Sequence, residues 1–261
     1  MQAFPASHKA EPAESPGFSL TEFLRRIPLF ENVDGQVVER LGTAATHCRY
    51  VRGEPLWQAG QAPVALAIVR SGLVKVVRPT PNGHTAICGL FGRSSPLGEV
   101  ALIKGIAYPS STLAATKIVS VVAIPRADLL DALSRDPKLS INLLCSLEGR
   151  LNMLHDKIDV LSAGSVDARL ATLLIKLYRQ FGDELDGGVP RIMVPLSRQE
   201  LADLVATSFE TAIRVLSRWE RAGVVSTDGD GFTLHDVEAL SATSGVSSAD
   251  WALSSWPGGA S

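Results

Sequence analysis

The chain has 261 residues, of which 46% are hydrophobic, and its formal net charge is −2. Since a domain usually contains about 100–200 residues, this length favours two domains, each with a modest core. The nearly balanced charge argues against a protein that coats nucleic acid, although a few well-placed arginines can still create a local positive field.

The first 19 residues are expected to form a disordered arm. They contain Pro5, Pro12 and Pro16 together with Glu11 and Glu14, and they have no apolar run. Such a segment has too few apolar groups to offset the entropy lost on ordering, and it lacks the apolar region of a secretory signal. No run of about 18 apolar residues follows that could span a bilayer. We therefore expect a cytoplasmic protein without a membrane partner.

The three cysteines do not form a metal-binding or redox motif. Cys48, Cys88 and Cys145 are far apart in the sequence, and none belongs to a C-x-x-C pair. Zinc sites and redox-active dithiols need such pairs. We expect reduced, buried thiols in a cytosolic protein.

Residues 20–136 are expected to form a β-rich sensor domain. From about residue 40 to residue 126, short runs of β-branched and apolar residues alternate with Gly and Pro turns. The predicted strands are Leu66–Val69, Leu73–Val77, Thr85–Leu90, Ser111–Ala115 and Ile118–Ile124, with a turn at residues 79–83. Several short strands at this spacing are typical of an antiparallel sandwich or jelly roll.

A long helix is predicted over residues 137–163. Its apolar residues follow a 3-4-3-4-3 spacing, which is the a/d pattern along which two helices pair. The residues of this seam are Leu144, Leu147, Leu151, Leu154, Ile158 and Leu161. Because no second segment of the chain has a matching pattern, we expect the same helix of another copy as the partner, in a homodimer. The alternative is a helix that packs on its own sandwich.

Residues 165–240 are expected to form a second domain, after a break and candidate hinge at residues 163–164. Ser165 can cap a helix over residues 166–181. A loop at residues 182–190, a strand at residues 191–194, two helices and a hairpin then follow. The hairpin is predicted from the Asp-Gly turn at residues 228–231. Residues 241–261 are expected to form a flexible tail, in which Trp251 and Trp256 are the bulky residues.

The stretch from residue 196 to residue 220 predicts two short helices joined by a tight turn. Ser197 and Glu200 form a capping-box pattern that starts the first helix, and Ser208 can cap the second. Four apolar residues of the second helix recur at a spacing of three or four and can pack against the first: Ala212, Val215, Leu216 and Trp219. Two helices in this arrangement have the geometry of a helix-turn-helix.

Polar residues occupy the other face of the second helix. Glu210 and Arg214 are four residues apart, so they project side by side from its N-terminal half. An arginine can donate two hydrogen bonds to guanine, and a glutamate can accept one from cytosine. Contacts with phosphate, which position a protein on DNA without specifying sequence, are expected from Arg198, Gln199, Ser208, Thr211 and Arg218. The alternative is that Glu210 and Arg214 form only an i,i+4 ion pair on the surface.

Residues 20–240 resemble the CRP/FNR superfamily of bacterial transcription regulators. The motifs that carry the resemblance are Arg52–Leu56, Val69–Val76, Leu97–Leu102, Ser197–Ala202 and Glu210–Arg214. The resemblance implies an α+β fold with an N-terminal cyclic-nucleotide-binding-like β-roll, a central dimerisation helix and a C-terminal winged helix-turn-helix. It also implies double-stranded DNA as a partner, with a palindromic site whose half-sites have a TGA-like core and lie about one helical turn apart. RNA polymerase is a further expected partner of such a regulator.

Three positions of the helix-turn-helix depart from the family pattern or vary within it. Phe209 and Ile213 stand where family members differ to adjust the remaining bases. Ala206 replaces a glycine that is common in the turn. We expect this departure to be mild, because alanine reaches most turn conformations.

The resemblance also locates an effector pocket, at Glu99, Val100, Ser110, Ser111, Leu154 and His155. Members that bind cyclic nucleotides have a Gly-Glu-x-x-Leu run followed by Arg-Ser/Thr-Ala, and they pair the arginine with the cyclic phosphate. Here the arginine position is Pro109, and Leu154 and His155 replace the polar pair that contacts adenine. A buried phosphate without a cation is unfavourable by several kcal/mol. Tight binding of cyclic AMP is therefore not expected.

The cofactor stays unknown. An iron–sulfur cluster is disfavoured, because it needs about four clustered thiolates. Haem stays open, with His155, His47 and His84 as candidate ligands, although each is also explained as a structural or solvated histidine. Another small molecule, a redox signal through a thiol, or no effector at all are the remaining alternatives.

Two other functions compete with an effector-controlled regulator. One is a regulator of the same fold that needs no effector, and the other is a β-roll that binds a ligand without any DNA function. The second alternative leaves residues 197–234 without a role. An enzyme is not expected, since the sequence has no Gly-rich phosphate loop, no paired-His metal motif and no Gly-x-Ser-x-Gly elbow.

Overall fold

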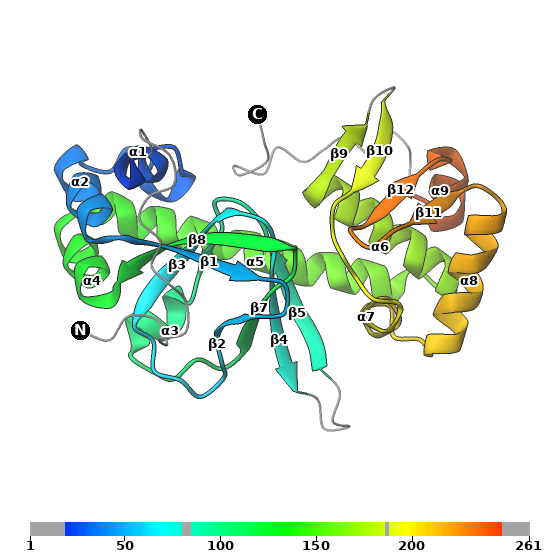
Figure 1. The fold of residues 1–261 in the computed structure, drawn as a ribbon, viewed down its shortest axis with the longest axis horizontal. Coiled ribbons are helices and arrows are strands. Elements are labelled where there is room, and N and C mark those ends of the chain that lie inside the picture. The colour runs from blue at the N-terminus through cyan, green and yellow to red at the C-terminus, as the bar shows by residue number, and fades with distance from the viewer. Residues whose placement is uncertain (1–18, 80–84, 186–187, 247–261) are drawn as a thin grey trace. The chain divides into compact units, whose positions relative to one another are not determined.

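The computed structural model describes residues 19–79, 85–185 and 188–246 (Figure 1). The chain forms two compact units that divide between Arg150 and Leu151, inside one helix, and each unit is described by itself. The predictions for residues 1–18, for the turn after residue 79 and for Trp251 and Trp256 lie outside the described residues. Ser19 was expected in the disordered arm. It instead caps a helix, because its Oγ accepts a hydrogen bond from the Glu22 N–H.

The first unit begins with short helices rather than strands. These are α1 (Leu20–Arg25), the 3₁₀ helix η1 (Pro28–Phe30) and α2 (Gly35–Ala44). The side chain of Asp34 starts α2 by accepting hydrogen bonds from the N–H groups of the next turn. The β-type pattern, which starts near residue 40, did not predict these helices.

Two four-stranded antiparallel sheets form a β-roll. One sheet has the order β1-β8-β3-β6 and the other β2-β7-β4-β5. Their strands are β1 (Thr46–Val51), β2 (Pro55–Trp57), β3 (Ala65–Ser71), β4 (Val74–Pro79), β5 (Thr85–Phe91), β6 (Pro96–Leu97), β7 (Ser111–Ala114) and β8 (Ile118–Pro125). The five predicted strands are confirmed with bounds close to those expected, and so is the jelly-roll class.

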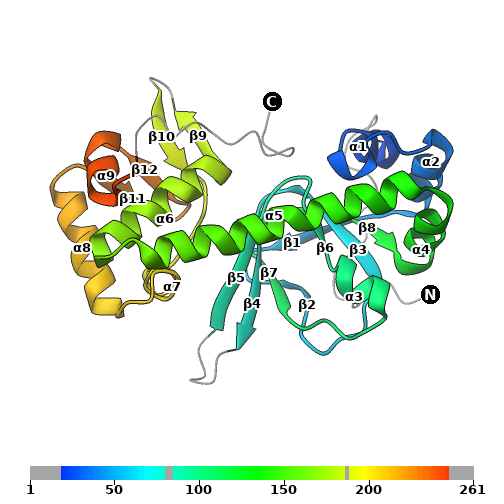
Figure 2. The same ribbon diagram turned by 180° about the vertical axis from the view of Figure 1, so that it is seen from behind.

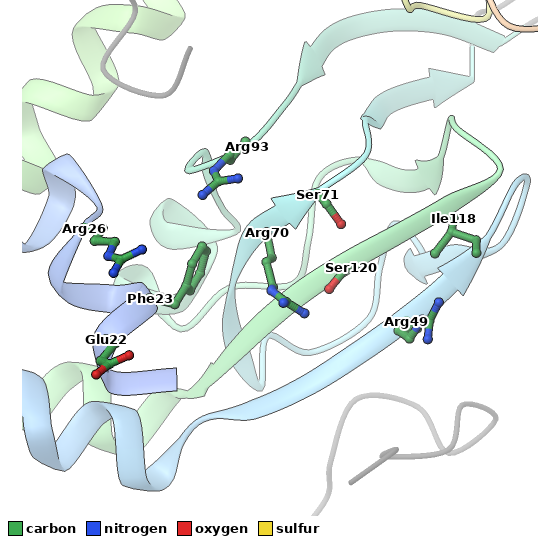
Figure 3. A pocket seen from close by; sticks show the side chains of 9 residues that line it. All are labelled: Glu22, Phe23, Arg26, Arg49, Arg70, Ser71, Arg93, Ile118 and Ser120. Atoms are coloured by element: carbon green, nitrogen blue, oxygen red, sulfur yellow. The ribbon is translucent and has the colours of Figure 1, made fainter. Parts of the chain in front are cut away.

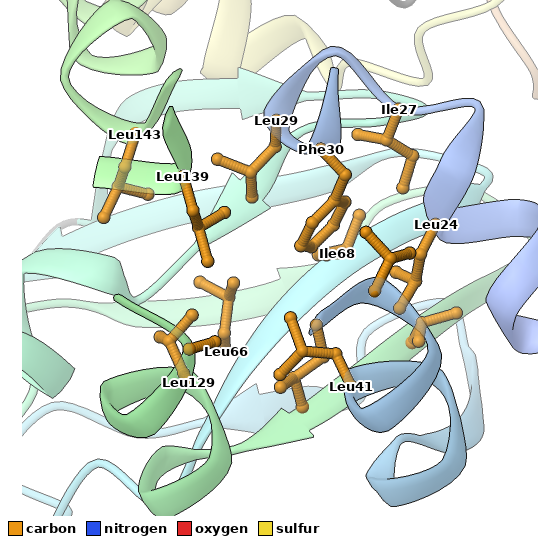
Figure 4. Packing of buried hydrophobic residues seen from close by; sticks show 14 of the residues in the cluster. Leu24, Ile27, Leu29, Phe30, Leu41, Leu66, Ile68, Leu129, Leu139 and Leu143 are labelled. Carbon is orange, nitrogen blue, oxygen red and sulfur yellow. The ribbon is translucent and has the colours of Figure 1, made fainter. Parts of the chain in front are cut away.

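The sheet that contains β3 and β8 is buried on both faces. Its inner face packs against the second sheet through Val69, Val121 and Trp57. Its outer face is covered by α1, η1, α2, α4 (Arg126–Arg135) and the start of α5, as Figure 4 shows. Burial on both sides explains why β3 and β8 have continuous apolar runs instead of an alternating pattern. A sixth helix of this unit, α3 (Glu99–Lys104), follows β6.

The predicted long helix is confirmed as α5 (Pro137–Ser162), which is continuous (Figure 2). Leu139 and Leu143, near its start, are buried in the core of the first unit. In the described parts of the chain, no helix has both the length and the apolar composition needed to cross a membrane.

The second unit combines helices with one small sheet. After α5 come α6 (Val166–Phe181), β9 (Gly182–Leu185), β10 (Val189–Ile192), α7 (Arg198–Leu204), α8 (Phe209–Arg221), β11 (Val225–Thr227), β12 (Phe232–Leu234) and α9 (Val237–Ser244). Ser165 caps α6 as predicted, since its Oγ accepts a hydrogen bond from the Ala168 N–H at 3.1 Å. The predicted hairpin is confirmed as β11–β12, and the sheet has the order β11-β12-β10-β9.

Two predictions for the second unit are wrong. The expected loop at residues 182–190 contains the strand β9, which pairs with β10 through register contacts from Gly182 to Leu185. The expected flexible tail begins inside α9, whose Leu240 is fully buried. Both segments have a polar composition, which predicted neither the strand nor the helix. In α9 the buried residue is Leu240.

Candidate nucleic-acid interface and effector pocket

The two helices of the predicted helix-turn-helix start where the sequence places them. The Ser197 Oγ accepts a hydrogen bond from the Glu200 N–H at 3.2 Å, and a Glu200 carboxylate oxygen accepts one from the Ser197 N–H at 2.7 Å. This reciprocal pair is the predicted capping box of α7. Ser208 caps α8 in the same way, since its Oγ accepts a hydrogen bond from the Thr211 N–H.

The apolar stripe of α8 determines which of its residues face solvent. The four residues predicted to pack inward are all buried: Ala212, Val215, Leu216 and Trp219. Glu210 and Arg214 are exposed, Phe209 is 41% exposed, and Ile213 is half-buried. In the described residues no ion pair joins Glu210 to Arg214, so the surface-pair alternative is not what the structure contains. The outward face therefore offers one carboxylate and one guanidinium for other partners.

Arg198 has internal partners that the sequence did not predict. Its Nη2 donates to a Glu220 carboxylate oxygen and to the Thr227 hydroxyl, each at 2.7 Å. Thr227 also donates a short hydrogen bond to Glu220. Burial raises the pKa of Glu220, but the hydrogen bonds from Thr227 and Arg198 outweigh it and leave the pKa below its ordinary value. This network ties the start of α7 to the end of α8 and to the first strand of the hairpin.

The other expected phosphate-contacting residues also have neighbours within the unit. Gln199 donates through Nε2 to an Asp203 carboxylate oxygen at 2.8 Å and is exposed. Arg218 forms a close ion pair with Asp167, at the start of α6, and its side chain is 52% exposed. The Ser208 and Thr211 hydroxyls hydrogen-bond to each other at 3.0 Å. All four residues lie on or beside the exposed face of α7 and α8.

The turn between α7 and α8 corrects one expectation. Ala206 has a φ of 50°, in the left-handed region that favours glycine. We expected alanine to be tolerated because it reaches most turn conformations. The structure shows that it occupies a conformation that is unfavourable for a residue with a Cβ atom, by about 1–2 kcal/mol.

Arg169 holds this turn in place and was missed in the sequence. From α6, its Nη1 donates to the Val205 carbonyl oxygen at 2.7 Å and to the Ala206 carbonyl oxygen at 3.2 Å. Carbonyl groups at the end of a helix lack partners within the helix, and a cation that donates to them stabilises that end. No local motif marks Arg169, because its partners are 36 and 37 residues away.

The predicted seam of α5 is largely uncovered in the single chain. Leu144 is 67% exposed, Leu151 57%, Leu154 54% and Ile158 59%. Leu161 is 41% exposed, and Leu147 is partly buried. A monomer rarely leaves so many large apolar side chains of one stripe in water.

Glu99 is the best-defined residue of the expected effector pocket. It is only 1% exposed, and its carboxylate forms an ion pair with Arg150 of α5, with Oε1 and Nη2 2.5 Å apart. Arg150 also donates to the Pro96 carbonyl oxygen and lies over the Phe91 ring, 5.2 Å from its centroid. Gly98 precedes Glu99 with a φ of 88°, a conformation that only glycine adopts readily.

Arg150 is a functional candidate that sequence reasoning missed. It is 51 positions away from Glu99, so no spacing rule connects the two residues. Burial raises the pKa of Glu99, and the neighbouring Arg150 lowers it to a smaller extent, so the pKa stays above its ordinary value of 4.5.

The remaining residues of the expected pocket are used or placed in different ways. Ser111 accepts a hydrogen bond from the Ala59 N–H, and the Ser110 carbonyl oxygen accepts one from the Trp57 indole. Val100 is 42% exposed. Leu154 and His155 are exposed residues of α5 in the second unit, whereas Glu99 belongs to the first.

The candidate haem ligands and thiols have distinct environments. His47 is 7% exposed, and its Nε2 lies 2.5 Å from the Ser120 Oγ, whereas His155 is exposed. His84 lies outside the described residues. The expectation of buried thiols is wrong for Cys88 and Cys145, which are exposed, and Cys48 is only partly buried. Burial raises the pKa of the Cys48 thiol, which lowers its thiolate fraction and its reactivity. Among the described residues, no group of three or more His, Cys, Asp or Glu is arranged to hold a metal ion.

The pH dependence of stability tests the environment of Glu99. A carboxyl whose pKa is raised by folding contributes most to stability below pH 4.5, and this contribution is lost as the pH rises through its folded-state pKa. We expect the free energy of unfolding of the wild type, relative to Glu99→Gln, to fall as the pH is raised from about 4.5 to about 7.5. Urea denaturation across this range measures the difference. Glu148→Gln, at an exposed position of α5, is the matched control for loss of a carboxylate. If the free energy of unfolding of the wild type, relative to Glu99→Gln, increased as the pH rises, the raised pKa of Glu99 would be contradicted.

Comparisons with known proteins agree with this architecture. Residues 168–243 match the family described as "Crp-like helix-turn-helix domain", and residues 47–136 match "Cyclic nucleotide-binding domain". The chain is 30% identical to the "Cyclic AMP receptor protein" of Thermus thermophilus, over 76% of this chain and 88% of that protein. It is 28% identical to the "CRP-like cAMP-activated global transcriptional regulator" of Mycobacterium tuberculosis, over 85% and 98% of the two chains. The structure is similar to that of the c-di-GMP responsive regulator CLP of Xanthomonas campestris, with a TM-score of 0.62, 25% identity and coverage of 77% and 99%. The β-roll, α8 and the hairpin that follows α8 thus lie in the domains that these families describe. The chain belongs to the CRP/FNR family of transcription regulators.

Proposed function

We propose that this regulator binds, as a homodimer, to a palindromic DNA site through α8, and that an effector other than cyclic AMP controls it. The observation that carries the proposal is the outward face of α8. Glu210 and Arg214 are exposed there and do not form an ion pair with each other, while the opposite face is buried. A carboxylate and a guanidinium one turn apart have the donor and acceptor groups that base edges in the major groove require.

Base recognition in this proposal comes from four residues. Arg214 donates to guanine, Glu210 accepts from cytosine, and Phe209 and Ile213 contact the neighbouring bases. By family resemblance, Glu210 and Arg214 specify a TGA-like core in each half-site. The half-sites lie about one helical turn apart on DNA, because the two copies of α8 are related by two-fold symmetry.

Phosphate contacts position α8 in the groove. Gln199, Ser208, Thr211 and Arg218 supply donors around it, and their present partners are exposed or partly exposed side chains that DNA can displace. Arg198 has a second part in this proposal. Its Nη2 braces α7 against Glu220 and Thr227, while its remaining N–H groups are available to a phosphate.

The dimer in this proposal forms along the exposed seam of α5. The six seam residues keep one a/d pattern, and burying them against a second copy would remove their apolar surface from water. The same helix carries Arg150, the ion-pair partner of Glu99. RNA polymerase is a further partner in this proposal, and the site of action is the cytoplasm.

The effector differs from cyclic AMP in this proposal, although two relatives are named for that nucleotide. The position expected to hold the phosphate-binding arginine is Pro109, which is exposed, and the carboxylate of Glu99 is already paired with Arg150. An arginine does reach this segment, since Arg78 donates to the Pro109 carbonyl oxygen, but from an exposed position on β4. The relative named as responsive to c-di-GMP indicates that members of this fold respond to different molecules. A regulator without any effector is the alternative, and specific DNA binding by the purified protein without additions would favour it.

Substituting Arg214 tests base recognition. On a site selected from random DNA, Arg214→Ala is expected to weaken binding by about 1–3 kcal/mol and to relax selection at one base pair. Arg198→Ala is expected to weaken binding to all sequences alike and to reduce the salt slope by about one. Fluorescence anisotropy at several salt concentrations measures both, and Arg135→Ala, an exposed arginine of α4, is the control. Identical behaviour of the Arg214 and Arg198 variants on random DNA would contradict the assignment of roles.

Charges introduced into the seam test the dimer. Ile158→Glu and Leu151→Glu place a carboxylate among apolar side chains that the dimer would bury, so each is expected to produce monomers where the wild type is dimeric. Light scattering during size-exclusion chromatography measures the mass. Asn152→Glu adds the same charge to an exposed position outside the seam and is expected to leave the dimer intact. If all three variants stay dimeric, copies of the chain associate elsewhere.

Calorimetric titration tests the effector. Because no buried arginine at position 109 would neutralise the cyclic phosphate, cyclic AMP is expected to bind weakly, if at all, to the wild-type dimer. The DNA affinity of the protein, measured with and without cyclic AMP, is the second readout. A micromolar or lower Kd for cyclic AMP would contradict this part of the proposal, and an accompanying increase in DNA affinity would identify cyclic AMP as the effector.

A further inference from the structure

A cavity lies on the outer face of the sheet that contains β1, β3 and β8. Its volume is about 370 Å³, and it is lined mainly by arginines and by a buried serine (Figure 3). The polar side chains that matter for its chemistry are Arg26, Arg49, Arg70, Arg93, Glu22 and Ser120. None of them belongs to the expected effector pocket or to the DNA-binding face.

The arginines converge from separate parts of the first unit. Arg49 lies on β1 and Arg70 on β3, and both are partly buried at the floor of the cavity. Arg26 follows α1, and Arg93 lies between β5 and β6, where both are exposed at the rim (Figure 3). Arginines that serve only as solvated surface charges have no need to gather around one cavity, because each side chain could extend into water by itself.

The local charge is strongly positive. Four arginines line the cavity, and among the described residues that line it Glu22 is the one carboxylate. The pKa of Arg70 is lowered mainly by burial and further by the charges of Arg93 and Arg49, so both neighbours repel the Arg70 guanidinium. An anion bound in the cavity would offset this repulsion, because it attracts each guanidinium group.

Ser120 completes the floor, and His47 lies in contact with it. Ser120 is 4% exposed, and its Oγ lies 2.5 Å from the His47 Nε2, which in turn is 3.5 Å from the Arg70 Nη1. The Ser120 hydroxyl lies between Arg70 and Arg49 (Figure 3) and can form a hydrogen bond with a ligand that the positive field attracts. Planar guanidinium groups match the oxygens of a phosphate group, to which they can donate pairs of hydrogen bonds.

We propose that this cavity binds a small phosphorylated anion with two or more negative charges, as a second ligand site of the sensor domain. The volume is near the lower end of the range of about 300–1,000 Å³ for ligand pockets, which suits a molecule no larger than a mononucleotide. Several arginines around one cavity favour a ligand with several charges over a single carboxylate. The site is independent of base recognition by α8.

Thermal unfolding of the full-length wild-type dimer tests the site. Pyrophosphate, inorganic phosphate and adenosine monophosphate are compared with potassium chloride at equal ionic strength, because a ligand that binds the folded state raises its Tm. Pyrophosphate is expected to raise the Tm by a few degrees, and inorganic phosphate by less. A larger effect of the nucleotide than of pyrophosphate identifies a nucleoside phosphate as the ligand, and the reverse order identifies a bare polyphosphate. Both orders support the site.

Variants assign the effect to the cavity. Arg70→Gln and Arg93→Gln are each expected to remove most of the increase in Tm, and Arg93→Gln, at the exposed rim, keeps the test valid if Arg70→Gln does not fold. Arg135→Gln changes an exposed arginine of α4 in the same unit and is expected to keep the full increase. Arg214→Ala, which removes the proposed guanine contact, is also expected to keep it. This control separates the site from DNA binding.

Three results would overturn the proposal. The first is an equal increase in Tm for the wild type and both cavity variants, and the second is no increase with any of the phosphate compounds. The third is an increase that Arg214→Ala abolishes, which would locate phosphate binding on α8. Isothermal titration of pyrophosphate into the wild type and Arg93→Gln supplies the direct measurement, in which at least a tenfold weaker Kd of the variant is expected.

Discussion

The burial of one apolar stripe on α8 is the constraint on which the proposed DNA-binding face depends. Ala212, Val215, Leu216 and Trp219 pack inward at a spacing that fits the helical period, so the residues between them have to point outward. The exposed positions of Glu210 and Arg214 are a consequence of this packing and not of any contact that they make themselves. A rotation of α8 that brought them inward would place two charges in an apolar core, which is strongly unfavourable.

Long-range hydrogen bonds determine the position of α8 in the unit, and its own sequence does not encode them. Arg169 holds the preceding turn through two carbonyl oxygens, and Arg198 connects the start of α7 with Glu220 and the hairpin. The strained φ of Ala206 persists because these contacts and the two capped helices determine the turn from both sides. A substitution at Arg169 would therefore disturb DNA binding without removing any group that faces DNA.

Local chemistry explains which parts of the structure could be predicted. The capping box at Ser197 and Glu200, the caps at Ser165 and Ser208 and the period of the α5 seam all depend on residues fewer than five positions apart, and the helices begin where these signals place them. The β-roll strands were predictable for the same reason. The helices before β1, the strand β9 and the helix α9 were not, because a polar or short segment becomes ordered only through the surface it packs against.

The same distinction explains which site residues were missed. Arg150 pairs with Glu99 across 51 positions, and the arginines of the cavity on the outer face of the sheet come from four separate segments. Only the fold brings these residues together. Glu99 itself was found through its motif, whereas the groups that determine its charge state were not.

The pairing of Glu99 with Arg150 has a physical consequence for any effector of the β-roll. A ligand that binds to the Glu99 carboxylate has to compete with Arg150 or bind to both, and Arg150 belongs to α5, the helix with the exposed seam. Binding at this position would therefore change the free energy of the contacts between α5 and the β-roll. A ligand shifts a conformational equilibrium only through such a difference between states. An anion in the cavity beyond the outer face of the sheet would act on α1, β1 and β3 instead, so the two sites would bias different elements of the sensor domain.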